Sequence, residues 1–130
     1  LLFMRELARR AGDAGADLVS VAAHPGYAST HLQGASAEQS GGWLLSRAAG
    51  ALMATGNRLF AQSDAAGALP QLYAATMPDV AAGDYLGPDG PFEMRGSPKK
   101  VGMSAEAHDD DAARQVWALS EELTGVTYDW

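Results

Sequence analysis

A histidine, a proline, a glycine and a hydroxyl group follow closely after the apolar and small residues 19–23. After His24, Pro25 fixes the backbone and removes a hydrogen-bond donor, and Gly26 lets the backbone approach a flat ligand closely. Thr30 adds a hydroxyl that both donates and accepts hydrogen bonds, as a ligand with an amide group requires. Two interpretations stay open on these residues alone: a ligand-binding turn, or a strand terminator followed by a helix cap.

The segments before this turn predict an α/β fold. Residues 1–11 place apolar side chains at helical spacing and charged ones on the other face, and Gly12 supplies a stop. Residues 17–23 are apolar on both faces, as a strand of a parallel sheet covered by helices must be. In open sheets of this kind, ligands bind at the carboxyl ends of the strands, which is where the turn lies. We expect residues 17–23 to be a central strand, flanked by strands outside this sequence or from a second chain.

Further helices and one short strand are predicted downstream. Helical patterns cover residues 43–55 and 63–76, and Ser63 or Asp64 is a possible cap of the second helix. Pro70 either lies close to the start of that helix or kinks it. After these come a candidate strand at residues 85–86, a turn at 87–90 and a surface excursion to residue 100, which includes a surface pair of Glu93 and Arg95.

Three aspartates, Asp109–Asp111, predict the start of the last helix, because carboxylates interact favourably with the N-terminal end of the helix dipole. Gly125 fits a left-handed cap at its end. His108 beside the aspartates could suggest a metal site, but a solvated helix start is the favoured interpretation. One stripe of apolar side chains is expected to be buried, made up of Ala113, Val116, Trp117, Leu119 and Leu123.

The composition excludes several classes of function. The chain of 130 residues fits one domain, and with a net charge of −7 and only 9 Lys and Arg it offers no basic surface to a nucleic acid. It contains no cysteine, which excludes thiolate chemistry and suits a cytoplasmic location. No apolar run reaches the ~18 residues of a membrane span, because Arg47 interrupts the best candidate. The apolar segments 43–53 and 123–130 predict interfaces of an oligomer, and the wall of a pocket is an equal alternative for the first.

The order of five segments resembles the carboxyl-terminal half of the short-chain dehydrogenase/reductase family. The segments are LLFMRELARR, VSVAAHPGYAST, AAGALPQLYAAT, GDYLGPDG and ALSEELTGV. The retinol dehydrogenase-like and WW-domain oxidoreductase-like branch resembles them most. The resemblance implies that residues 1–130 are the carboxyl-terminal portion of a single NAD(P)-binding Rossmann-type domain, whose doubly wound parallel sheet is incomplete in this chain. The first helix also lacks a capping residue before it, as expected for part of a longer polypeptide.

The same resemblance implies a site for NAD or NADP. The turn would cover the nicotinamide, the backbone of Ala28 would meet the carboxamide, and Thr30 would bind the carboxamide or the pyrophosphate. Residues 31–60 would be the variable substrate loop and helix. The implied cofactor contacts are therefore Pro25, Gly26, Ala28 and Thr30, and the implied substrate contacts are Tyr27 and His31.

The parts of that family which carry out catalysis are expected upstream of Leu1. These are a Gly-rich phosphate loop, a Ser and a Tyr-x-x-x-Lys pair, and no tyrosine of this chain has Lys at the fourth position after it. No catalytic residue and no metal ligand is assigned, and we expect this segment alone to be inactive. The complete protein would be an oxidoreductase that interconverts a small alcohol and a carbonyl. Its partners would be a second copy or the amino-terminal half; the alternative is a non-catalytic binding or assembly module derived from the same scaffold.

Overall fold

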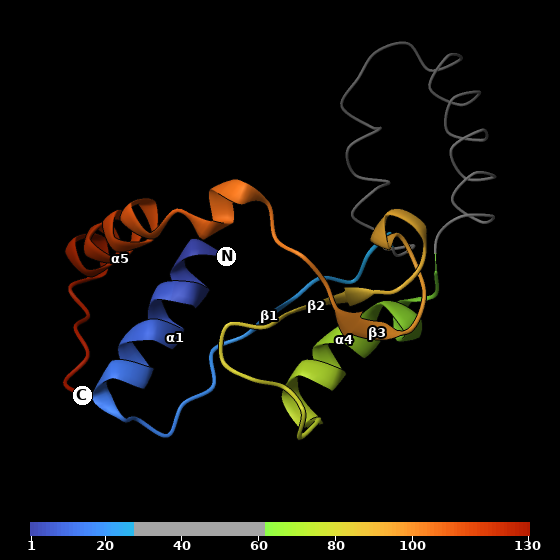
Figure 1. The fold of residues 1–130 in the computed structure, drawn as a ribbon, viewed down its shortest axis with the longest axis horizontal. Coiled ribbons are helices and arrows are strands. Elements are labelled where there is room, and N and C mark those ends of the chain that lie inside the picture. Colours follow the sequence, from blue (N-terminus) through green and yellow to red (C-terminus); the bar gives the residue numbers. More distant parts are fainter. Residues whose placement is uncertain (28–61) are drawn as a thin grey trace, which may run out of the picture. The chain divides into compact units, whose positions relative to one another are not determined.

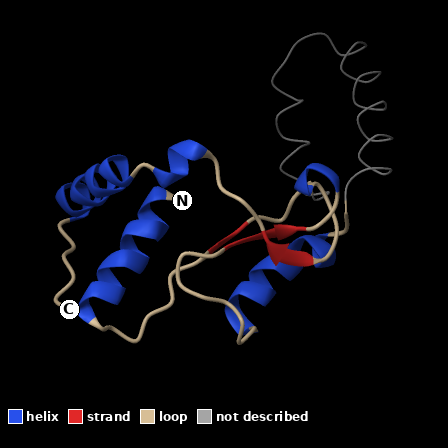
Figure 2. Cartoon of the chain, viewed as in Figure 1, coloured by secondary structure: helices blue, strands red, loops and turns tan. Residues whose placement is uncertain are grey.

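A computed structural model describes residues 1–27 and 62–130 (Figure 1). Helices and strands alternate along these residues, so the predicted mixture of helix and sheet is confirmed (Figure 2). The helix predicted at residues 43–55 lies outside the described residues. In chain order the elements are α1 (Leu2–Ala14), β1 (Ala22–Ala23), α4 (Asp64–Thr76), β2 (Tyr85–Pro88), the short 3-10 helix η1 (Pro91–Glu93), β3 (Pro98–Lys100), the 3-10 helix η2 (Ala105–His108) and α5 (Asp110–Thr124).

The three strands form one sheet in the order β1-β2-β3. β1 and β2 are parallel, with Ala22 opposite Tyr85 and Ala23 opposite Leu86. A parallel pair needs a long crossover connection between its strands, and α4 lies in the stretch of chain between them. The sheet therefore has the parallel pairing that the apolar strand pattern predicted.

β1 is shorter and more exposed than the sequence predicted. Leu18 and Val19, expected to be buried in a strand over 17–23, are 38% and 59% exposed. β1 is short because its partner strand, β2, begins late. The chain before β2 is a turn, in which the Asp84 carboxylate accepts a hydrogen bond from Ala81 N at 2.7 Å. Extended backbone that can pair with β1 therefore begins only at β2. The strand beside β1 is β2, which belongs to this chain, and this corrects the expectation that the flanking strands lie outside this sequence. A further strand on the other side of β1 stays a prediction.

The strand prediction also needed correction further along the chain. β2 continues to Pro88, two residues into the turn predicted at 87–90. The segment expected to be a surface excursion ends in β3. A hydrogen bond from Asp89 N to Ser97 O, 2.9 Å long, joins the chain just after β2 to the chain just before β3. Asp89 and Ser97 are 8 positions apart, and the Gly and Pro residues between them led the sequence analysis to expect a surface excursion rather than a strand.

The chain divides into two compact units, and α4, β2 and β3 each contribute residues to both. Unit 1 comprises Leu1–Ala23, Gln71–Leu86 and Lys100–Trp130. Unit 2 comprises His24–Pro70 and Gly87–Lys99.

The core of unit 1 lies between α1 and α5. The Trp117 ring is buried, with Phe3 stacked on it at 5.1 Å between ring centroids and the Arg10 guanidinium 4.6 Å from its centroid. The predicted stripe on α5 is narrower than expected, because Leu119 and Leu123 are 52% and 75% exposed. Leu119 follows Trp117 by two positions, which is about 200° around a helix, so the two side chains lie on opposite faces.

The ends of the helices follow local chemistry. Asp109 caps α5 by accepting a hydrogen bond from Ala112 N at 2.9 Å, and Gly125 ends it in the left-handed region at φ 68°, as predicted. Ser63 caps α4 by accepting from Ala66 N at 3.2 Å, and Pro70 lies inside that helix. α1 runs through Gly12, the predicted stop, and ends at Gly15 instead, where φ is 66°.

Candidate functional site

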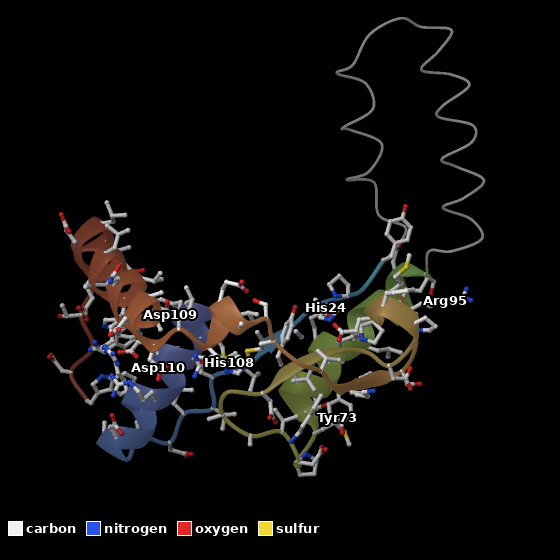
Figure 3. The ribbon with its side chains drawn as sticks, turned by 45° about the horizontal axis from the view of Figure 1, so that its top comes forward. His24, Tyr73, Arg95, His108, Asp109 and Asp110 are labelled. Carbon is white, nitrogen blue, oxygen red and sulfur yellow. The ribbon has the colours of Figure 1, made fainter. Side chains whose placement is uncertain are left out.

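The turn that follows β1 is a compact structure within unit 2. Gly26 has φ 65°, a left-handed conformation that glycine adopts without strain. Its N–H donates to Nδ1 of His24, labelled in Figure 3, at 3.3 Å. Pro25 is exposed, and Tyr27 is 36% exposed. The turn thus presents a proline ring and an aromatic side chain outward.

A second segment of unit 2, residues 88–94, packs closely against Gly26. A Cβ atom at Gly26 would lie 2.6 Å from Met94 O, 2.7 Å from Glu93 O and 2.7 Å from Cγ of Pro88. Tyr27 N donates to Met94 O at 2.6 Å. Glycine is therefore required at this position by the fold itself, for both its backbone angle and its lack of a side chain.

His24 joins the turn to η1 through its side chain. Its Nε2 lies 3.1 Å from Oε2 of Glu93. A Cβ at Gly87 would lie 2.0 Å from the same Nε2, so the imidazole occupies the space that a side chain at position 87 would need. The sequence interpretation had assigned Glu93 to a surface pair with Arg95. It missed the contact with His24 because the two residues are 69 positions apart.

Gln62 forms hydrogen bonds with the turn through both its backbone and its side chain. Its backbone N donates to Tyr27 O at 3.0 Å, and its Nε2 donates to Pro25 O at 2.5 Å. Its Oε1 accepts a hydrogen bond from Gly96 N at 3.3 Å. The carbonyl groups of Pro25 and Tyr27 are therefore satisfied by the chain itself, which leaves their exposed side chains for contact with a ligand.

An open depression of about 520 Å³ adjoins Gln62. Beside it, Phe92 and Glu93 adopt left-handed backbone angles, with φ 54° and 55°. Side chains other than glycine adopt these angles at a cost, and such residues often occur at functional sites. Phe92 is 94% exposed. The depression is lined by Gln62, Ala66, Gly90, Pro91, Arg95 and Gly96.

Three of the predicted site residues, Pro25, Gly26 and Tyr27, thus lie in one turn that several hydrogen bonds stabilise. The other three, Ala28, Thr30 and His31, lie outside the described residues. Gln62 and Glu93 support the turn, but the sequence analysis did not mention Gln62 and assigned Glu93 to a surface pair. Neither residue has a local sequence signal, because each acts through contacts that only the folded chain creates.

A second group of titratable residues lies in unit 1. The Tyr73 hydroxyl donates to Asp79 Oδ2 at 2.7 Å, and Lys100 Nζ donates to Asp79 O at 2.7 Å and lies 2.8 Å from Asp84 Oδ2. The hydrogen bond to the Asp79 carboxylate raises the pKa of Tyr73. These contacts join α4 and β3 to the chain between them.

The aspartates at the start of α5 act as the sequence predicted. Beyond the cap at Asp109, Asp110 Oδ1 lies 3.1 Å from Arg5 Nη2, and Asp111 pairs with Arg114 at 2.5 Å. Within residues 1–27 and 62–130, no three His, Cys, Asp or Glu side chains are grouped to hold a metal ion. None of the helices in these two ranges combines the length and apolar character needed to cross a bilayer.

A known protein sequence and a solved structure are each similar to most of this chain. Over 121 residues, 90% of this chain, the sequence is 32% identical to the short-chain dehydrogenase/reductase pkfC of Emericella nidulans. The fold is similar to the crystal structure of an uncharacterised protein from Mycobacterium paratuberculosis, with a TM-score of 0.65 and 33% identity over 99% of this chain. No protein-family model matches the chain.

The chain spans only 32% of the length of the Emericella protein and 37% of the Mycobacterium one. Both likenesses agree with a Rossmann-like α/β scaffold, and the first agrees with the resemblance to the short-chain dehydrogenase/reductase family. They do not distinguish one branch of that family from another.

Proposed function

We propose that this chain is the carboxyl-terminal portion of an NAD(P)-dependent short-chain dehydrogenase/reductase, and that its His24–Tyr27 turn forms one wall of the nicotinamide site. The turn itself carries the proposal. It follows the carboxyl end of a parallel strand, where open α/β sheets bind ligands, and its inner carbonyl groups are already hydrogen-bonded. The 32% identity to a protein named for this family supports the same assignment.

The exposed groups of the turn suit a flat, partly polar ring. Pro25 has no N–H and presents its ring outward, which suits packing against one face of a nicotinamide. The resemblance adds the backbone of Ala28 and the hydroxyl of Thr30 as partners of the carboxamide. When bound, the nicotinamide would supply or accept hydride as an alcohol and a carbonyl interconvert. The proton donor for that reaction is not assigned to any residue of this chain.

The remaining features of the proposal follow the sequence. Tyr27 and His31 contact a small alcohol or carbonyl substrate, and residues 31–60 select it. The protein belongs to the retinol dehydrogenase-like branch, works in the cytoplasm, and pairs with a second copy through apolar surface. That surface includes residues 123–130, where Val126 is 54% exposed.

Titration of the polypeptide that contains this chain with NADH and NADPH, followed by nicotinamide fluorescence, tests the proposal. We expect saturable binding, weakened roughly ten- to a hundredfold by Thr30→Val, because a buried ligand group loses its hydrogen-bond partner. Thr76→Val is the matched control, since the Thr76 hydroxyl donates to Leu72 O at the end of α4. Binding without any turnover would favour the non-catalytic module instead. No binding of either cofactor would contradict the proposal.

A further inference from the structure

We infer that Glu93 is a positioning residue for the cofactor-binding turn and that it acts through His24. The inference rests on the proposed nicotinamide site, but its structural part concerns unit 2 alone. Glu93 belongs to η1, whereas the turn follows β1, and the two are joined by the contact between His24 Nε2 and Glu93 Oε2 at 3.1 Å.

Two contacts of the imidazole indicate which ring nitrogen carries the proton. Gly26 N–H donates to His24 Nδ1 at 3.3 Å, so Nδ1 must be unprotonated. In a neutral imidazole the proton is then on Nε2, which donates to the carboxylate of Glu93. The result is a chain of two hydrogen bonds that runs from the backbone of the turn, through His24, to Glu93. A carboxylate that accepts from one nitrogen selects the tautomer in which the other can accept.

The His24 imidazole packs against Gly87, where even a Cβ atom would come within 2.0 Å of Nε2. The His24 side chain is 24% exposed, and that of Glu93 is 42% exposed. Gly87 therefore limits one side of the ring, and the contacts with Gly26 N and Glu93 Oε2 define its orientation.

The segment that carries Glu93 also contacts the turn through its backbone. Met94 O accepts from Tyr27 N at 2.6 Å, and Glu93 O would lie 2.7 Å from a Cβ at Gly26. Residues 93 and 94 therefore contact the turn on both sides of Gly26: the Glu93 side chain through His24, and the Met94 carbonyl group through Tyr27 N. The orientation of Pro25, which the proposed function places against the nicotinamide, depends on this support.

Two measurements test the inference. In the cofactor-free protein, ¹⁵N chemical shifts of the His24 imidazole at pH 8 should show the Nε2-protonated tautomer, and Glu93→Ala should shift the population toward the other tautomer. In NADH titrations, Glu93→Ala should weaken binding roughly tenfold, as expected for the loss of one hydrogen bond to a charged group. Glu93→Gln keeps an acceptor oxygen and should restore most of the affinity. The matched control is Glu122→Ala, an exposed carboxylate on α5 of unit 1.

The outcomes separate the inference from the proposed function. If neither the parent nor any variant binds NADH or NADPH, the proposed function fails, while the tautomer measurement still tests the hydrogen-bond chain. If the parent binds and Glu93→Ala binds equally well with an unchanged thermal midpoint, the positioning role is wrong. A His24 imidazole protonated on Nδ1 in the parent would overturn the inference whatever the cofactor does.

Discussion

Arg9 donates two parallel hydrogen bonds to the carboxylate of Glu6, from Nε at 2.9 Å and from Nη2 at 2.7 Å. Arg10 Nε donates to the same carboxylate at 2.7 Å. The Glu6 side chain is only 2% exposed, so both guanidinium groups neutralise a charge that has lost most of its water. The hydrogen bond from Arg9 outweighs the opposing effect of burial and lowers the pKa of Glu6 from its ordinary 4.5 to about 2.

This lowered pKa predicts an acid-sensitive contribution to stability. The contribution is fully present above about pH 4.5 and is lost as the pH falls toward 2, because the unfolded chain takes up the proton first. Glu6→Gln should reduce the free energy of unfolding by about 2 kcal/mol at pH 7, measured in urea. The difference from the parent should shrink between pH 4.5 and 2.

Asp13→Asn is the control for that experiment. Arg9 Nη1 also donates to Asp13 at 2.6 Å, but the Asp13 side chain is 68% exposed. An exposed pair of this kind contributes little, so the change should stay within about 0.5 kcal/mol. Equal losses of unfolding free energy for Glu6→Gln and Asp13→Asn would show that the burial of Glu6 does not determine how much its ion pairs stabilise the protein.

Replacement of two glycines by alanine should have opposite effects. At Gly26 the added Cβ meets two backbone oxygens within 2.7 Å, and φ is 65°, so we expect a loss of about 2–4 kcal/mol. At Gly12, inside α1, nothing lies within 4 Å of the added atom. Gly12→Ala should stabilise the protein by about 0.5–1 kcal/mol, because alanine favours a helix. Thermal unfolding measures both, and a neutral Gly26→Ala would contradict the described turn.

Two replacements at Trp117 should differ sharply in cost. Its indole Nε1 is buried and finds no hydrogen-bond partner within the described structure. Trp117→Phe removes that unsatisfied donor and keeps a ring to stack on Phe3, whereas Trp117→Ala leaves a cavity. We expect about 3–5 kcal/mol for alanine and less than half of that for phenylalanine, from urea unfolding. Similar losses would mean that the full indole shape is essential.

Removal of the Tyr73 hydroxyl should leave function intact. The hydroxyl donates to Asp79 at 2.7 Å in unit 1, and this contact raises the pKa of Tyr73. Tyr73→Phe should cost no more than about 1 kcal/mol of stability, the contribution of one hydrogen bond. NADH affinity and any turnover of the whole protein should match the parent. A large loss of turnover with unchanged stability would instead identify Tyr73 as a catalytic residue.

The sequence predicted best those features that depend on neighbouring residues. The start of α5 at the three aspartates and its end at Gly125 follow from neighbouring residues, and both are confirmed. Of the two candidate caps of α4, Ser63 and Asp64, it is Ser63 that accepts the capping hydrogen bond. The end of α1 was misplaced because Gly12, with no positive φ, is tolerated inside a helix, whereas Gly15 adopts the left-handed cap.

Features that depend on distant residues were predicted less well. Glu6 lies on the charged face predicted for α1, yet its side chain is buried, where Arg9 and Arg10 neutralise its charge. The length of β1 depends on where its partner strand, β2, begins. The turn at Gly26 is stabilised by Glu93 and Gln62, which are distant in the sequence. None of these pairings leaves a periodic pattern in the sequence, because strand partners and side-chain contacts form between segments far apart.

The hydrogen bond from Gln62 N to Tyr27 O has a consequence for how such a chain can change during evolution. Both of its atoms belong to the backbone, as do those of the hydrogen bond from Tyr27 N to Met94 O. Neither bond therefore depends on which side chain position 27 carries. Substitutions at Tyr27 can change the exposed side chain of the turn while its backbone keeps the same hydrogen bonds.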